Sequence, residues 1–295
     1  MGREDRPQLR LHDVLYFVGF WVTFLVRYVI EWLCFTPCPA THSDTTQWIH
    51  TIEHNDRKLV LAIWTPSMPS FQEMESPYYI SRLADRRFLQ LDPRKRTIIV
   101  FHAKQDTVYN WMPLIAPLAK TYDMNIVLVE YPGYGSNEFG RLRPNEISCV
   151  FDGMAAHSWV ACATNQEIYI MGDSLGCGVA AGVASMVPCA GLLLFSPFVS
   201  VLTVVSPFLA KWFFVFDVFP VASTLERVRC PVLVFHGSHD RVVSPEHTRY
   251  LERMSADIFN RTFVYVAGLH HNDMLRTTNH AAFKSHLLHF FGLPE

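Results

Sequence analysis

Seven short apolar segments between residue 58 and the end of the chain constrain the fold most strongly. Several are near-continuous runs of isoleucine, valine, leucine and phenylalanine, which is typical of parallel strands buried on both faces. We expect strands at 58–64, 97–102, 125–130, 167–172, 190–196, 231–237 and 262–267. Segments long enough for crossover helices lie at 107–120, 145–163, 174–187, 247–256 and 281–291. This alternation predicts an α/β fold with a mostly parallel central sheet flanked by helices.

Composition agrees with one sizeable core and excludes several function classes. Of the 295 residues, half are hydrophobic and 14% are aromatic. We find no internal repeat or linker after the N-terminal segment, so we expect a segment at 1–40 and one catalytic domain at 41–295. The net charge is −2 and the sequence contains no basic stripe, so a nucleic-acid partner is not expected. The seven cysteines and fourteen histidines lack metal-ligand or disulfide-framework spacing, so we expect no metal and no cofactor.

Residues 14–35 form a long hydrophobic segment for which we expect a membrane-anchor helix. As a helix, these residues would be about 33 Å long, enough to cross a bilayer core. Arg27 and Glu31 interrupt the segment four positions apart, so they share a helix face and can pair. A membrane span, a helix lying in the membrane interface or packed on the domain, and a cleaved signal peptide remain open, although no clear cleavage site follows.

The side of the membrane is also left open. Arginines at positions 3, 6 and 10 precede the segment, and the positive-inside rule then places the catalytic domain on the side away from the cytoplasm. The glycosylation sequon at Asn260 fits that orientation. Palmitoylation of Cys34 or Cys38 would fit a cytoplasmic domain instead.

The turn after the predicted strand 167–172 carries the strongest candidate for a nucleophile. It contains Gly172-Asp173-Ser174-Leu175-Gly176 and continues into a stretch rich in glycine and alanine. A nucleophile on a sharp strand-to-helix turn needs small residues two positions before and after it, and glycine stands at both. Such a turn exposes the hydroxyl and directs the helix N-terminus toward it. We therefore predict Ser174 as the nucleophile and the N–H of Leu175 as an oxyanion donor.

A serine nucleophile needs a base, and the base needs a carboxylate to orient it. Asp240 follows the sixth predicted strand, where the acid belongs when the chain order is serine, acid, histidine. His270 and His271 both follow the seventh predicted strand and compete as the base. Asp273 is a second candidate acid, but it is better placed to cap the next helix. The histidines that flank the acid, interpreted as structural or solvent-facing, are His236 and His239.

Two further segments belong near this site. The loop after strand 97–102 should supply a second oxyanion donor, for which the N–H of Lys104 is the candidate. Residues 198–230 contain six phenylalanines and Trp212 and should lie as a crossover, or lid, over the edge of the sheet. This crossover could line an apolar pocket, contact the membrane, or simply pack as helices.

Several motifs together resemble those of the α/β-hydrolase domain proteins. They are Glu130-Tyr131-Pro132-Gly133-Tyr134-Gly135-Ser136, Gly172-Asp173-Ser174-Leu175-Gly176, Phe216-Asp217-Val218-Phe219-Pro220, Val234-Phe235-His236-Gly237 with Asp240, and Gly268 with His271-Asn272-Asp273. The chain is most similar to the membrane-tethered subgroups 13 and 17, which are described as serine hydrolases or serine peptidases. The resemblance implies an α/β-hydrolase fold and aligns His271, not His270, with the base.

The resemblance also bears on substrate. Similar proteins of subgroup 17 remove palmitate from proteins, which implies an acylated protein or lipid-like substrate with a thioester or ester bond. Peptide cleavage ranks lower. One departure motivates a rival: family members carry His-Gly-Asn where this chain has His102-Ala103-Lys104, and alanine does not readily take a positive φ. The rival is a non-catalytic, membrane-tethered binding protein, and the oligomeric state stays open.

Overall fold

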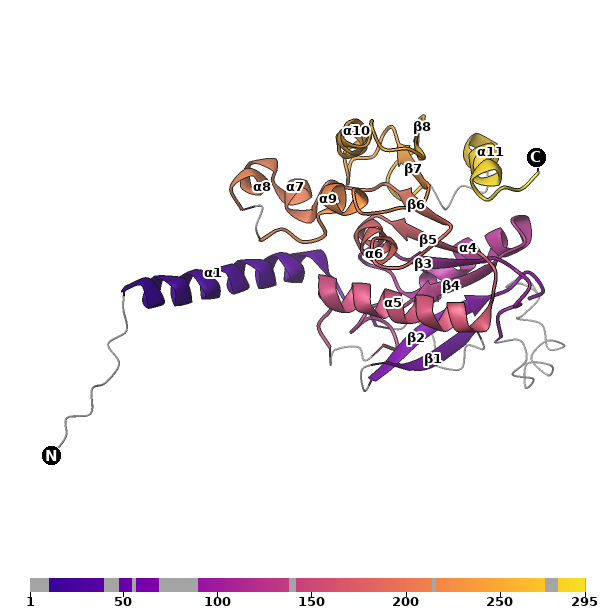
Figure 1. Ribbon diagram of the computed structural model, residues 1–295, viewed down its shortest axis with the longest axis horizontal. Helices are drawn as coiled ribbons and strands as arrows, with labels where there is room; N and C mark the ends of the chain where they lie inside the picture. The colour runs from indigo at the N-terminus through magenta and orange to yellow at the C-terminus, as the bar shows by residue number, and fades with distance from the viewer. Residues whose placement is uncertain are drawn as a thin grey trace.

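An eight-stranded sheet forms the centre of the molecule in the computed structural model (Figure 1). The structure describes residues 11–39, 48–54, 57–68, 90–137, 142–213, 216–273 and 281–294. The strands are β1 (Ile49–His54), β2 (Arg57–Trp64), β3 (Thr97–Phe101), β4 (Asn125–Val129), β5 (Ile168–Asp173), β6 (Gly191–Phe195), β7 (Val232–Gly237) and β8 (Arg261–Val266). Their order is β1-β2-β4-β3-β5-β6-β7-β8. β1 and β2 run antiparallel to their neighbours, and the other strands pair in parallel.

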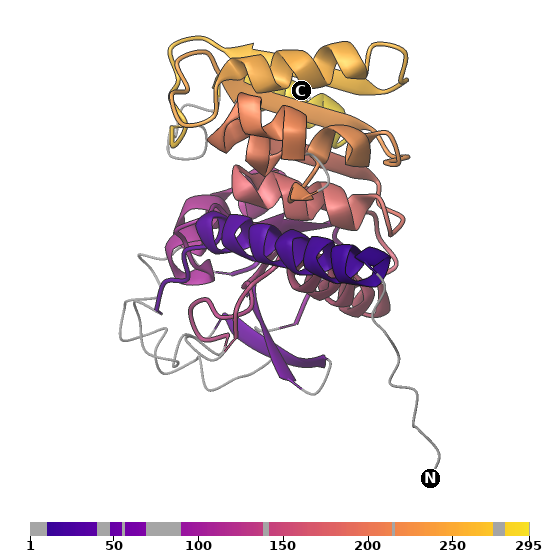
Figure 2. The same cartoon turned by 90° about the vertical axis from the view of Figure 1, so that its left-hand side faces the viewer.

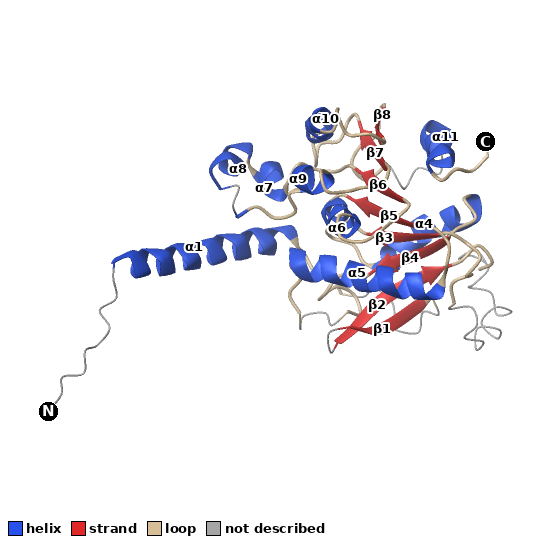
Figure 3. Ribbon diagram, viewed as in Figure 1, coloured by secondary structure: helices blue, strands red, loops and turns tan. Residues whose placement is uncertain are grey.

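Helices cover both faces of the sheet (Figure 3). They are α1 (Leu11–Cys34), α4 (Val108–Thr121), α5 (Glu146–Ala163), α6 (Leu175–Ala184), α7 (Val201–Val205), α8 (Pro207–Phe213), α9 (Val221–Leu225), α10 (Pro245–Met254) and α11 (Ala281–Phe290). One core cluster joins the sheet to α5, α6, α9 and α10, and the opposite cluster joins it to α4 and α11. The predicted mostly parallel sheet flanked by helices is therefore confirmed.

All seven predicted strands are present, with ends that differ by about one residue from those expected. The eighth strand, β1, was not predicted. The sequence of this strand is Ile-His-Thr-Ile-Glu-His. Polar residues are tolerated in it because the strand lies at the edge of the sheet, where two of its side chains are exposed. An edge strand lacks the continuous apolar run that identified the buried strands.

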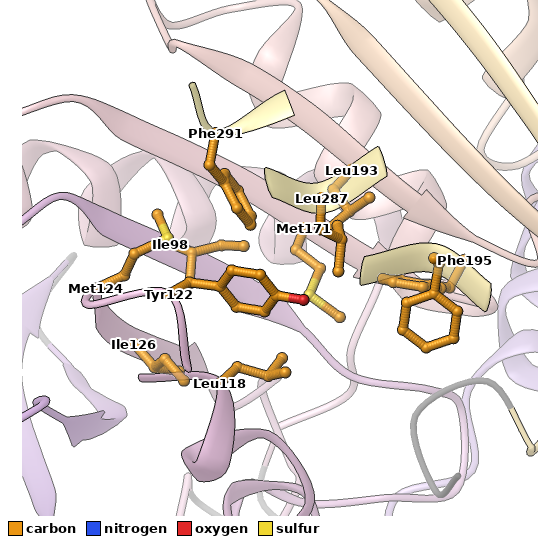
Figure 4. Close-up of a pocket in the computed structure, with 11 residues that line it drawn as sticks. Ile98, Leu118, Tyr122, Met124, Ile126, Met171, Leu193, Phe195, Leu287 and Phe291 are labelled. Carbon is orange, nitrogen blue, oxygen red and sulfur yellow. The ribbon is translucent and has the colours of Figure 1, made fainter. Parts of the chain in front are cut away.

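The face of the sheet that is covered by α4 and α11 contains a small apolar gap between these helices and the strands (Figure 4). Its volume is about 20 Å³, and its lining includes Ile98, Tyr122, Met171 and Phe291. An apolar cavity of this size has no set of polar partners for a water molecule and is a packing defect of the core. It does not contain any of the predicted site residues.

Helix α1 extends away from the domain, and only its C-terminal part packs on it (Figures 1 and 2). Ile30, Cys34 and Phe35 are buried against the core. Arg27 lies 3.5 Å from Glu31, as the four-residue spacing predicted, and also donates to Glu146 of α5 at 2.7 Å. The end of α1 is thus attached to the domain by both apolar packing and an ion pair.

The prediction of a transmembrane helix at residues 14–35 needs correction. Within the described residues, no helix combines the length and the apolar character that a membrane span requires. The final turns of α1 are instead occupied by contacts with the domain: Ile30 is buried, and Arg27 is paired with Glu146. These contacts, which would be lost in a lipid-embedded span, agree with the alternative of a helix packed on the domain.

Cys34 and Cys38 differ in their suitability for acylation. The thiol of Cys34 is buried at the end of α1, and this burial raises its pKa to about 12. Cys38 is partly exposed, and its thiol contacts the carbonyl oxygen of Thr36 at 3.3 Å. A buried, protonated thiol is a poor acyl acceptor, so only Cys38 keeps an accessible position.

The aromatic crossover at 198–230 contains the three short helices α7, α8 and α9. Phe219 is buried and packs against α6, where a side chain at Gly178 would lie 2.5 Å from its ring. In contrast, Phe208 and Trp212 of α8 are 72% and 67% exposed. Phe214 lies outside the described residues. The crossover therefore has a packed end near α6 and an exposed apolar end at α8, and α7 between them contacts α1 (Figure 1).

Candidate active site

Ser174 occupies a sharp turn between β5 and α6. Its φ of +50° and ψ of −116° are strained for a residue with a side chain. The close approach of the chain explains both flanking glycines: a Cβ at Gly172 would lie 2.3 Å from the carbonyl oxygen of Gly176. A Cβ at Gly176 would lie 2.1 Å from the carbonyl oxygen of Phe101 at the end of β3. The glycines therefore allow the turn to close against the neighbouring strand.

Three of the predicted residues form a continuous hydrogen-bonded chain. Nε2 of His271 lies 2.8 Å from Oγ of Ser174, and Nδ1 of His271 lies 2.7 Å from Oδ2 of Asp240. Asp240 follows β7, His271 follows β8, and Ser174 follows β5, so three carboxyl ends of parallel strands supply the three side chains. This is the geometry in which a histidine removes the proton of a serine.

The surroundings of Asp240 keep it ionised. Burial alone would raise its pKa, but hydrogen bonds from His236, His271 and the N–H of Val243 outweigh burial and hold the pKa below its usual range. Oδ1 accepts from the N–H groups of Val242 and Val243 at 2.9 Å each. The carboxylate is therefore fixed in orientation by its own loop.

His271 is influenced in the opposite direction. Burial lowers the pKa of its imidazole, but the hydrogen bond to Asp240 and the negative charges of Asp173 and Asp240 raise the pKa above its ordinary value. The imidazolium that forms when His271 takes a proton is therefore stabilised by two carboxylates.

The alternative base and acid lie outside this chain of contacts. His270 is exposed, and its ring lies at an angle of 45° to that of His239, with 5.8 Å between the centroids. Asp273 accepts a hydrogen bond from the backbone N–H of His270 at 2.9 Å, so its carboxylate closes a local turn. Geometry therefore favours His271 over His270 and Asp240 over Asp273. His239 is exposed, as one of the two interpretations expected.

His236 has a larger part in the site than its sequence position indicated. It is fully buried, and its Nε2 lies 2.9 Å from the carbonyl oxygen of Val243 and 3.3 Å from Oδ2 of Asp240. Because Nε2 faces two acceptors, it carries the hydrogen, and Nδ1 accepts from the hydroxyl of Thr248 at 2.6 Å. His236 is therefore a second support for the acid, which no spacing in the sequence revealed.

The oxyanion loop after β3 is held by residues of the 130–136 motif. His102 is buried, with Nε2 3.0 Å from Oε1 of Glu130. The hydroxyl of Tyr131 donates to the carbonyl oxygen of His102 at 2.6 Å, and that of Tyr134 donates to the carbonyl oxygen of Lys104 at 2.8 Å. The loop thus has fixed partners on both sides of Ala103.

Two observations bear on the departure of this loop from the family pattern. Ala103 is not among the described residues with positive φ, so the replacement of glycine by alanine causes no backbone strain. The ammonium of Lys104 does not face the nucleophile: it donates to the carbonyl oxygen of Leu33 in the last turn of α1 at 2.6 Å. The Lys104 side chain therefore connects the oxyanion loop to α1. Its ammonium serves as a cationic partner for the carbonyl groups at the C-terminal end of that helix.

Leu175 and Lys104 remain the candidates for the backbone donors of an oxyanion hole. Leu175 is the first residue of α6, so its N–H has no partner within the helix. The close approach of Gly176 to the carbonyl oxygens of Phe101 and His102 brings the start of α6 against the loop that contains Lys104. The two segments that would supply the donors are therefore adjacent.

Comparisons with known proteins agree with the fold. No protein-family model matches the chain. An uncharacterized protein of Mycobacterium tuberculosis is 33% identical over 156 residues, which cover 51% of this chain and 54% of that protein. Alpha/beta hydrolase domain-containing protein 17C of Homo sapiens is 29% identical over 193 residues, 63% of this chain and 56% of that protein. The chain thus spans little more than half the length of these relatives.

A solved structure gives the same result at the level of the fold. The esterase Pf2001 of Pyrococcus furiosus superposes with a TM-score of 0.63 and 14% identity, covering 87% of this chain and 98% of that protein. The chain has the α/β-hydrolase fold and resembles the subgroup 17 proteins, as predicted from its motifs. The fold and these relatives support a hydrolase.

Proposed function

We propose that the chain is a membrane-associated serine hydrolase that cleaves an ester, thioester or amide through an acyl-enzyme on Ser174. One observation carries the proposal: the hydrogen bonds of 2.8 Å and 2.7 Å that join Ser174, His271 and Asp240. A strained nucleophile turn and a carboxylate held ionised by its loop support the same function.

In the first half of the reaction, Oγ of Ser174 attacks the substrate carbonyl while Nε2 of His271 takes its proton. The resulting oxyanion is stabilised by backbone N–H groups, for which we propose those of Leu175 and Lys104. Asp240 keeps Nδ1 of His271 protonated and stabilises the imidazolium. The imidazolium then gives its proton to the departing alcohol, thiol or amine, which leaves an acyl-enzyme.

In the second half, a water molecule attacks the acyl-enzyme while His271 accepts a proton from it. Collapse of the second tetrahedral intermediate returns the proton to Oγ of Ser174 and releases the carboxylic acid. The residues act through proton transfer and electrostatic stabilisation, and each of the three triad residues follows a strand of the central sheet.

We extend the proposal to a long-chain acyl substrate, such as an acylated protein, presented at a membrane. The exposed face of α1 supports a membrane surface as the site of action: its exposed apolar residues are Trp21, Val22, Phe24, Leu25, Tyr28, Val29, Trp32 and Leu33. A helix face in contact with water is ordinarily polar. Phe208 and Trp212 of α8 add exposed aromatic rings, which suit the interface between headgroups and acyl chains.

A fluorophosphonate probe tests the nucleophile directly. We expect the probe to label the wild-type protein and not Ser174→Ala, with Ser185→Ala as a matched control that keeps labelling because Ser185 lies at the far end of α6. Equal labelling of wild type and Ser174→Ala would refute the assignment.

A panel of p-nitrophenyl esters of increasing acyl length tests the reaction and its chain-length preference. Hydrolysis that rises with acyl length favours the long-chain substrate, and hydrolysis of peptide substrates alone favours the peptidase alternative. Absence of turnover on any substrate favours the non-catalytic binding protein.

Flotation with phosphatidylcholine vesicles tests the membrane surface. We expect the full chain to float with vesicles and the double variant Trp32→Glu, Trp212→Glu to remain largely in the protein fraction. Met186→Glu is a control for an exposed apolar residue far from this surface. Equal flotation of all three proteins would contradict the proposed surface.

A further inference from the structure

Asp173, the residue before the nucleophile, is a buried carboxylate without a hydrogen-bond partner among the residues that the structure describes. Its side chain is more than nine-tenths buried. It lines a cavity of about 30 Å³ together with His271 and Asn272. Its oxygens are not among the enclosed polar atoms that lack a partner, so they reach the open side of this cavity. The triad chemistry uses Ser174, His271 and Asp240, and the charge of Asp173 acts on it through the imidazole of His271.

The other walls of the cavity have a consistent character. Asp106 adds a second carboxylate from the loop after β3, and Trp111 and Leu114 of α4 add apolar surface. Trp111 is itself buried, so its indole ring is in a fixed position. An indole ring attracts cations by its electron-rich face. Two carboxylates beside a buried indole ring form an environment that favours a positive charge.

Among the described residues, no lysine or arginine lines the cavity, and the titratable groups that act on Asp173 are His271, Asp106 and Asp240. The ammonium of Lys104, two residues before Asp106, contacts α1 instead. Burial raises the pKa of Asp173 to about 7, and the charges of Asp106 and Asp240 act in the same direction.

We propose that this cavity, the Asp173 subsite, binds a primary ammonium group of the substrate beside the scissile carbonyl. The proposal rests on the proposed hydrolase function. A primary ammonium has three N–H donors, which suit two carboxylates that line one pocket without a lysine or arginine among the described lining residues. The carboxylates of Asp173 and Asp106 accept its hydrogen bonds, and Trp111 lies alongside.

The bound ammonium also affects the reaction. A negative carboxylate next to Ser174 opposes the negative charge that develops on the substrate oxygen. A cation in the subsite offsets that opposition in the transition state. We therefore expect the ammonium to increase kcat and not only to lower KM.

The experiment compares p-nitrophenyl esters of ω-amino acids, from glycyl to 6-aminohexanoyl, each with the neutral ester in which a methyl group replaces the ammonium. For the best-fitting length we expect kcat/KM at pH 8 to be about tenfold higher for the ammonium ester, as for a hydrogen bond to a charged group. We expect Asp173→Asn to bring that ratio close to one and Asp106→Asn to lower it partly. Asp123→Asn, an exposed carboxylate at the start of β4, should keep the ratio.

The pH dependence provides a second signature. The preference for the ammonium ester should fall as the pH decreases through about 7, because protonated Asp173 loses its charge. A wild-type ratio near one, or a ratio that Asp173→Asn leaves unchanged, overturns the proposal.

Binding without turnover separates this proposal from the hydrolase function. In saturation-transfer NMR, we expect n-butylammonium to receive saturation from the wild type and not from Asp173→Asn, with n-pentanol as the neutral control. Loss of fluorophosphonate labelling would reject the hydrolase function alone. Equal saturation of n-butylammonium by both proteins, or none by the wild type, would reject the subsite even if the hydrolase is active.

Discussion

The two halves of the candidate active site are supported in different ways. Ser174, His271 and Asp240 each follow a strand, and their supporting contacts come mainly from their own loops, such as the Val242 and Val243 N–H groups on Asp240. The oxyanion loop at 102–104 depends on distant residues instead: Glu130, Tyr131, Tyr134 and the last turn of α1. The difference predicts that changes in the triad abolish chemistry, whereas changes around the loop weaken it gradually.

The largest effect is expected from the acid. Asp240→Asn leaves His271 without the carboxylate that selects its tautomer, and kcat should fall about 10⁴-fold. Asp273→Asn is the matched control, because the Asp273 carboxylate accepts from the backbone N–H of His270 and is not part of the hydrogen bonds that join the triad, so the variant should retain activity within a few-fold. Steady-state kinetics on a p-nitrophenyl ester measures both. Equal losses in the two variants would contradict the assignment of Asp240.

The pH profile gives the next largest effect. His271 must be neutral to accept the proton, and its raised pKa places the acid limb of kcat/KM above pH 6.5. Below that limb, the rate should fall about tenfold per pH unit. Asp173→Asn removes a negative charge that stabilises the imidazolium, so the limb should move to lower pH. A limb below pH 6 in the wild type would show that His271 is not the base in this environment.

A smaller effect is expected from the support of the oxyanion loop. Tyr134→Phe removes the hydrogen bond to the carbonyl oxygen of Lys104 and the one that the Tyr134 hydroxyl accepts from the N–H of Thr36. Each such bond is worth about 1 kcal/mol, so kcat should fall by about threefold to tenfold with KM little changed. A fall of about 10⁴-fold would mean that the loop is as critical as the triad and would remove the contrast between the two halves.

The smallest effect is expected at the Lys104 side chain. Its ammonium binds the end of α1 and not the reacting atoms, so Lys104→Met should change kcat about twofold or less. The same variant should loosen α1, which hydrogen exchange of residues 30–36 can detect. A large loss of kcat without faster exchange would indicate that the Lys104 ammonium acts electrostatically on the reacting atoms and not through α1.

Much of the fold and of the triad could be predicted because the signals are local. Buried parallel strands have continuous apolar runs, and the small residues around Ser174 are required by a turn in which added Cβ atoms would lie 2.1 to 2.3 Å from backbone oxygens. The edge strand β1 was missed because its polar sequence lacks such a run. The membrane span was predicted from the length of an apolar segment. That length does not reveal the contacts that Arg27 and Ile30 make with the domain in the folded protein.

The candidate positions Ser174 and Asp240 were thus identifiable from the sequence, because strand ends and turn glycines mark them, and the resemblance to the family selected His271 over His270. Only the tertiary structure could bring the three side chains within hydrogen-bond distance, add His236 as a support for Asp240, and show that Tyr131 and Tyr134 hold the loop around Ala103. The charge on Asp173 was visible in the sequence, but its isolation was not. The burial of Asp173 and the absence of a hydrogen-bond partner among the described residues depend on which segments pack around it, and only the folded chain determines that packing.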